Sequence, residues 1–124
     1  MTTTLADLTL SRADLADLAA DPHAVLHFEH CTFDGADLSG LALQGAQFLG
    51  CSLAETVLDK ANLSDTRWLD CRAGAARFQL ANLSDARFHR CDLNTTDWTR
   101  ATLASARFAE VKLTGAQFRE AQTL

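Results

Sequence analysis

The stretch ANLSDTRWLDCRAGAARFQLANLSDARFHRCDL, residues 61–93, decides the fold because its large apolar residues recur at every fifth position. Extended in both directions, this series runs from Phe28 to Phe118. Eighteen of its nineteen positions hold Phe, Leu or Trp, and the exception is Ala73. A second series, mostly Ala, Thr and Cys, stands two residues earlier. The repeating unit is therefore small–x–large–x–x.

A period of five fits neither regular secondary structure. In an α-helix five residues turn the chain by about 140°, which spreads the large side chains around every side. A continuous strand alternates its faces, so an odd period sends successive large residues to opposite faces. A chain that bends once in each unit instead directs both series inward and the other three residues outward.

Longer repeats give the number of bends in one turn of the coil. The pentapeptide ANLSD occurs at 61–65 and again at 81–85, twenty residues later. The same spacing relates the four cysteines and three of the arginines: Cys31, Cys51, Cys71 and Cys91; Arg67, Arg87 and Arg107. Twenty residues are four units, so the sequence predicts a four-sided coil in which like residues stack on like.

The motif A-[D/N]-L-x-x, present at 36–40, 61–65 and 81–85, resembles the pentapeptide repeat family. The resemblance covers residues 24–121. It implies an all-β fold, a right-handed quadrilateral β-helix of about five 20-residue coils with a turn at each corner. With coils about 4.8 Å apart, the rod would be roughly 24 Å long.

The two ends of the chain depart from the repeat in different ways. Residues 1–25 fit the period only in part, and Ser11 to Asp14 form a capping-box pattern that can open a short helix. We therefore expect 1–25 to be an N-terminal cap, an irregular coil or a short helix or both, and 26–124 to be the β-helix. No cap is visible at the other end, so we expect a homodimer through C-terminal coils that expose Leu113 and Phe118. The alternatives are that the last residues fold over that end, or that the chain is a segment of a larger protein.

Composition narrows the classes of function. The 124 residues carry a net charge of −5, with −8 on residues 1–65 and +3 on 66–124, which argues against direct nucleic-acid binding. No apolar run is long enough to span a membrane and no signal peptide is visible, so we expect a cytoplasmic location with free thiols.

No residue pattern indicates catalysis, a metal or a cofactor. A column of cysteines about 4.8 Å apart matches neither a zinc site nor a disulfide, so the thiols are interpreted as core residues. The histidines lack metal-ligand spacing, and no nucleophile or phosphate-loop motif is present. We expect a protein without enzymatic activity whose structural core includes Phe28, Cys31, Phe48, Cys51, Trp68, Cys71, Phe88, Cys91 and Phe108.

One side of the coil is the candidate partner-binding face. Its outward positions include Arg67, Arg87 and Arg107 in one column, with Leu49 and Leu69 beside them. Stacked like charges repel, which favours an anionic partner. The competing interpretation is that Asp70 and Glu110 neutralise the column as an ordinary solvated face. A second side, with Asn62, Ser64 and their equivalents, is small and polar.

Two functions remain in competition. A rigid rod without a pocket suits a protein–protein interaction module. The family resemblance raises an alternative: a DNA mimic that binds bacterial type II topoisomerase (DNA gyrase or topoisomerase IV) and protects it from quinolones or toxins. Residues 71–78, CRAGAARF, are similar to a stretch of that subgroup. The charge density argues against it, because about 24 Å of B-DNA carries roughly fourteen charges.

Overall fold

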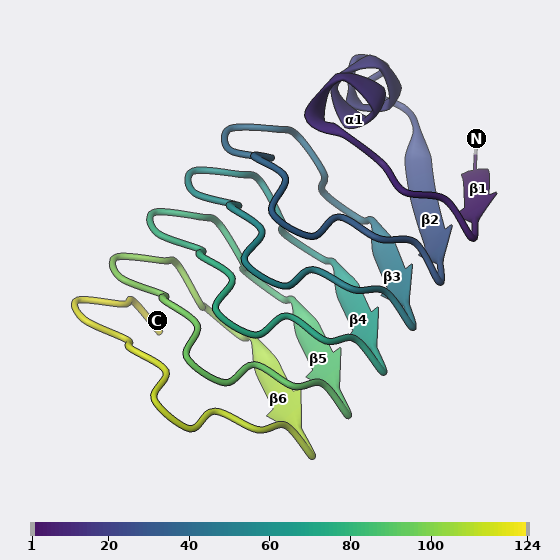
Figure 1. The fold of residues 1–124 in the computed structure, drawn as a ribbon. Helices are drawn as coiled ribbons and strands as arrows, with labels where there is room; N and C mark the ends of the chain where they lie inside the picture. The colour runs from purple at the N-terminus through teal and green to yellow at the C-terminus, as the bar shows by residue number, and fades with distance from the viewer. Residues whose placement is uncertain (1, 124) are drawn as a thin grey trace.

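The computed structural model describes residues 2–123 as a coil of parallel strands with one short helix near its start (Figure 1). Among these residues, no helix has the length and apolar character needed to cross a bilayer. In chain order the elements are β1 (Thr2–Ala6), α1 (Arg12–Ala19), β2 (Val25–Glu29), β3 (Gln47–Leu49), β4 (Arg67–Leu69), β5 (Arg87–His89) and β6 (Arg107–Ala109).

The six strands form a single parallel sheet in the order of the sequence. From β2 onward, each residue pairs with the residue twenty positions later, as Phe48 does with Trp68 and Trp68 with Phe88. The other three sides are joined by single bridges with the same step, for example Asn62 to Asn82. The coil of four sides and twenty residues predicted from the period is therefore confirmed.

Three corners of each coil are closed by a backbone turn. The N–H of the small residue donates to the carbonyl of the preceding large residue, as from Ala61 to Leu58 at 3.1 Å. The residue before the small one adopts a positive φ, as at Gly45 (+75°) and Leu80 (+59°). This is the left-handed conformation that the third position of a type II turn requires. Side chains other than glycine occupy it at most of the corners, at a steric cost.

The fourth corner, which follows each strand, is built differently. Among residues 2–123, no backbone hydrogen bond spans this corner as one does at the other three. The cysteines occupy the small-residue position of this corner. The Cys71 thiol donates to the carbonyls of Phe48, in the preceding coil, and Leu69 at 3.2 and 3.5 Å. Cys51 and Cys91 repeat this arrangement. Cysteine therefore serves this corner as a weak hydrogen-bond donor as well as a small core residue.

The interior contains two columns of stacked aromatic rings, packed beside buried leucines. One runs from Phe28 through Trp68 to Phe108, with neighbouring ring centroids 4.0 to 5.1 Å apart, and the other pairs Phe78 with Trp98 at 4.1 Å. Of the aromatic and cysteine residues that the sequence assigns to the core, Phe108 is half-buried in the last coil. The others are buried: Phe28, Cys31, Phe48, Cys51, Trp68, Cys71, Phe88 and Cys91.

Buried threonines satisfy the polar atoms of both tryptophans. The indole N–H of Trp68 donates to the Thr66 hydroxyl at 2.9 Å, and that hydroxyl donates to the carbonyl of Leu63 at 2.7 Å. Thr96 and Trp98 repeat the pair. Among residues 2–123, no buried side-chain nitrogen or oxygen lacks a partner.

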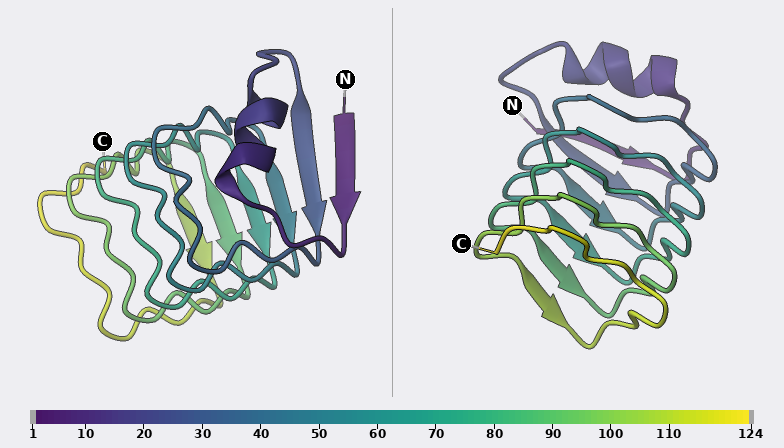
Figure 2. Two further views of the ribbon diagram at one scale, coloured as in Figure 1. Left: turned by 45° about the horizontal axis from the view of Figure 1, so that its top comes forward. Right: turned by 90° about the vertical axis from the view of Figure 1, so that its left-hand side faces the viewer.

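The N-terminal segment contains both a strand and a helix. Ser11 and Asp14 form the capping box that the sequence predicts, and Leu15 of α1 is fully buried. The helix stands over the N-terminal end of the coil in Figure 2. Arg12 ties it to the first coil by donating to the carbonyls of Asp37 and Ser39, both at 2.9 Å.

The register of the N-terminal segment differs from the period. Continued backward, the twenty-residue step would align Leu8 with Phe28, but the structure pairs Leu5 with Phe28 and leaves Leu8 45% exposed. The offset is 23 residues because α1 replaces regular units of the coil, and a helix advances the chain less per residue than an extended side does.

The other end of the coil leaves apolar side chains in contact with solvent. Phe118 is 40% exposed, whereas Phe108 and Leu113 are half-buried. A depression of about 530 Å³ lies there, lined by Leu103, Phe108, Phe118 and Ala121 among others. This end lies opposite α1 along the rod (Figure 1).

Candidate protein-interaction face

Strands β2 to β6 present two columns of side chains to solvent. Alternate residues of a strand point to opposite sides, so Phe28 of β2 and the central residue of each of β3 to β6 enter the core, and the residues on either side of them face outward. We call this surface the sheet face. Its first column is His27, Gln47, Arg67, Arg87 and Arg107, and its second is Glu29, Leu49, Leu69, His89 and Ala109.

The three arginines of the first column are aligned and carry no counter-charge. Arg67 and Arg107 both pair through Cα with Arg87, and all three side chains are exposed. Within residues 2–123, none of them forms an ion pair or a side-chain hydrogen bond. The two nearest corner acids in sequence, Asp65 and Asp85, do not come within ion-pair distance either.

Asp70 and Glu110 form their ion pairs with other bases and none with the arginine column. Asp70 pairs with Arg90 at 3.1 Å, and Glu110 with His89 at 2.8 Å. Asp70 and Glu110 lie at the corner that follows the strands, and the bases they bind come from the same corner or the second column. The first column therefore keeps its three positive charges.

Exposed leucine lies beside these charges. Leu49 is 38% exposed and Leu69 is half-buried. Together with Gln47, Phe48 and Arg67 they line a shallow depression of about 260 Å³. The candidate partner-binding residues thus lie on one surface, where Arg67 borders a small apolar hollow and Arg87 and Arg107 continue the same column away from it.

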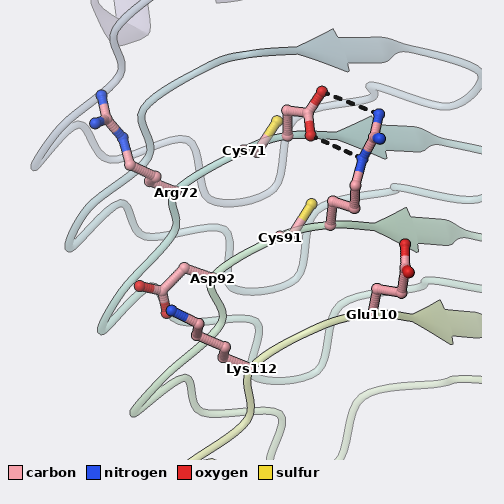
Figure 3. Close-up of a pocket in the computed structure, with 8 residues that line it drawn as sticks. Cys71, Arg72, Cys91, Asp92, Glu110 and Lys112 are labelled. Carbon is pink, nitrogen blue, oxygen red and sulfur yellow. Dashed lines mark hydrogen bonds and ion pairs between the residues drawn. The ribbon is translucent and has the colours of Figure 1, made fainter.

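A second depression, of about 320 Å³, lies at the corner next to the sheet face (Figure 3). Cys71 and Cys91 lie at its base. Along one edge, successive coils carry Arg72, Asp92 and Lys112. The signs of these charges alternate, so the depression has no net preference for an ion of either sign. It was not identified from the sequence, because its residues come from three coils and two sides.

The thiols beneath this corner are shielded from solvent, and the pKa shifts of two of them disfavour reaction. All four cysteines are free and buried. Burial raises the pKa of Cys31, and contacts with the sulfurs of Cys51 and Cys91, together with burial, raise the pKa of Cys71. Raised pKa values keep the Cys31 and Cys71 thiols protonated and weakly nucleophilic, whereas hydrogen bonding with Cys71 lowers the pKa of Cys51 and of Cys91. No group of three or more metal-ligating side chains is found among residues 2–123.

The small polar side of the coil is occupied by its own hydrogen bonds. The Asn62 side-chain carbonyl accepts from the backbone and hydroxyl of Ser64, and Asn82 accepts from the Ser84 backbone. These local bonds stabilise the turns. Within the described part of the chain, this side carries neither aligned cations nor an apolar hollow, so the sheet face remains the stronger candidate.

Comparisons with known proteins agree with this architecture. A family model described as a pentapeptide repeat region matches residues 24–94 and again 41–118. The crystal structure of a pentapeptide repeat protein from the thylakoid lumen of Arabidopsis thaliana aligns with a TM-score of 0.66 at 20% identity. The match covers 70% of this chain and 61% of that one, so the chain spans less than two thirds of that protein.

Two further solved structures align over nearly the whole chain but superpose less closely. HetL, involved in heterocyst differentiation regulation in Nostoc sp., is 18% identical over 96% of this chain and 84% of its own, with a TM-score of 0.39. QnrB1, a plasmid-mediated fluoroquinolone resistance protein, is 21% identical over 99% and 80%, with a TM-score of 0.36. A search of curated protein sequences gives no match.

Proposed function

Because the chain belongs to the pentapeptide repeat family, we propose that it is a non-enzymatic protein-interaction module and that the sheet face is its binding surface. The observation that carries the proposal is the column of Arg67, Arg87 and Arg107, aligned in register without counter-charges. Repulsion between aligned like charges raises the free energy of the unbound protein, and an acidic partner offsets that repulsion. The hollow beside Leu49 and Leu69 adds apolar contact.

The rod provides a rigid frame for such a surface. Every strand of the sheet face is bonded to its neighbours and lies on stacked rings, so the Cα atoms that carry its outward side chains keep a fixed spacing. Rigid surfaces lose little conformational entropy when they bind.

Capture from cell extract tests the proposal. The tagged protein is compared with Arg67→Glu/Arg87→Glu, which reverses two charges of the sheet face. The matched control is Arg72→Glu/Arg119→Glu, which reverses two exposed arginines on other sides that form no ion pair within residues 2–123. Mass spectrometry should find proteins captured by the wild type and the control but lost by the sheet-face variant. Equal capture by all three would contradict the proposal.

DNA mimicry toward type II topoisomerase is the second function that the family raises. A DNA mimic needs dense negative charge, whereas the most regular charge column of this surface is positive and the chain totals only −5. We therefore rank it second. A gyrase supercoiling assay tests it, with and without a quinolone: neither inhibition nor protection at micromolar protein would remove it.

We also propose that a second copy of the chain covers the C-terminal coil. The exposed Phe118 and half-buried Phe108 and Leu113 line an apolar surface at the end of the rod. Stacking two such ends would bury these rings and leave both sheet faces free for partners.

A further inference from the structure

We infer that the partner element recognised by the sheet face is an acidic amphipathic α-helix lying along the axis of the coil. This inference rests on the proposed function and names the chemistry of its partner. It follows from the direction and spacing of the three arginines and from the apolar hollow next to Arg67.

The arginine column runs along the rod, across the strands. Arg67, Arg87 and Arg107 are Cα partners in β4, β5 and β6, so each step along the column is one strand spacing, about 4.8 Å. The rings beneath them keep the same regularity: Trp68–Phe88 and Phe88–Phe108 are both 5.1 Å apart. The first and third charges are thus about 9.6 Å apart.

This spacing matches one face of a helix. Carboxylates at positions i, i+3 and i+7 lie on one stripe and rise by about 4.5 and 10.5 Å, close to the steps of the arginine column. An extended peptide places side chains of one face about 6.8 Å apart, so it falls out of step by about 2 Å at each coil. A helix therefore matches the spacing of the arginine column more closely than a strand does.

The second column of the sheet face fits the apolar stripe of such a helix. Leu49 and Leu69 bound the 260 Å³ hollow beside Arg67. Farther along, His89 is held by Glu110, and Ala109 is small, so the second column offers no free cation and little obstruction. A leucine one turn along the helix from an acidic position would reach the hollow.

The same features disfavour a nucleic acid or an anionic membrane. Phosphate groups gain nothing from the exposed leucine, and a chain of net charge −5 repels a polyanion at long range. A short acidic helix carries fewer charges and brings its own apolar stripe. These alternatives serve as outcomes of the test.

The test uses a labelled alanine-based peptide of about fifteen residues, long enough to be helical. It has Glu at i, i+3 and i+7 and Leu at i+4 and i+8. One control peptide distributes the same residues around the helix, and a second carries a central proline that breaks it. Fluorescence anisotropy at low salt measures binding to the wild type, Arg67→Glu/Arg87→Glu and the control Arg72→Glu/Arg119→Glu. Thermal melts check that the variants fold.

We expect the striped peptide to bind the wild type, with an affinity that falls on addition of salt. Arg67→Glu/Arg87→Glu should weaken binding at least about tenfold and the control by no more than about twofold. Equal binding of either control peptide would overturn the helix assignment. Tighter binding of a single-stranded oligonucleotide or of anionic vesicles would overturn it too. Capture that depends on the sheet face, without binding of the striped peptide, would refute this inference alone.

Discussion

Replacing Thr66 by valine should destabilise the protein although the shape of the side chain is kept. The hydroxyl accepts from the Trp68 indole N–H at 2.9 Å and donates to the Leu63 carbonyl at 2.7 Å, and Thr66 is fully buried. Valine leaves the indole without a partner and the carbonyl with only the longer 3.4 Å bond from the backbone of residue 66. An unsatisfied buried group costs about 1–3 kcal/mol, so Thr66→Val should cost about 2–4 kcal/mol.

A double-mutant cycle isolates the indole bond. Urea titrations followed by circular dichroism would measure the free energy of unfolding of Thr66→Val, Trp68→Phe and the double variant. With Trp68 replaced, Thr66→Val removes only the bond to Leu63 and should cost about 1–2 kcal/mol less than in the wild type. Thr56→Val is the matched control, because the Thr56 hydroxyl only donates, to Phe33 at 2.8 Å.

The reasoning fails if Thr66→Val costs less than about 0.5 kcal/mol, or costs the same whether residue 68 is Trp or Phe. Either result would mean that the indole N–H does not depend on the hydroxyl. An unchanged dependence on urea concentration is needed for the comparison, since it shows that the unfolded states are alike.

Three further predictions concern packing, turns and assembly. Phe88→Ala should lower the free energy of unfolding by about 3–5 kcal/mol in urea titration, because the ring lies between Trp68 and Phe108; a loss below 1 kcal/mol would contradict its inward orientation. Gly45→Ala should cost about 1–2 kcal/mol through its φ of +75° alone, since nothing lies within 4 Å of the added carbon; no loss of stability would contradict the turn geometry. Light scattering should give a dimer mass for the intact chain and a monomer mass for Phe118→Asp, and a monomer mass for both would refute stacking of the C-terminal coils.

Much of the fold could be predicted because its cause repeats. The spacing from Leu63 to Trp68 to Ala73 excludes a helix and a flat strand, and the return of Cys71 at Cys91 sets the length of one coil. The same register predicts that Arg67 and Arg87 stack. Nineteen repetitions of one pattern define the inside and the outside of the coil without any long-range information.

The periodic pattern does not predict which of several nearby residues a given side chain or strand will pair with. The choice of Arg90 rather than the arginine column as the partner of Asp70 depends on side-chain reach around a corner, which a periodic pattern does not contain. Leu5 rather than Leu8 aligns with Phe28 because a helix interrupts the register. One local signal was present and overlooked: a threonine precedes both tryptophans by two residues, at 66–68 and 96–98, and each pair forms a buried hydrogen bond.

Spin labels attached to two surface cysteines measure the central geometric claim directly. In Arg67→Cys/Arg107→Cys the labelled positions are forty residues apart in sequence but only two coil steps, about 9.6 Å, apart on the sheet face. In Arg67→Cys/Arg77→Cys they are ten residues apart and on opposite sides of the coil. Continuous-wave electron paramagnetic resonance should show strong dipolar broadening for the first pair and none for the second. Broadening for the second pair alone would contradict the twenty-residue coil, and with it the arginine column.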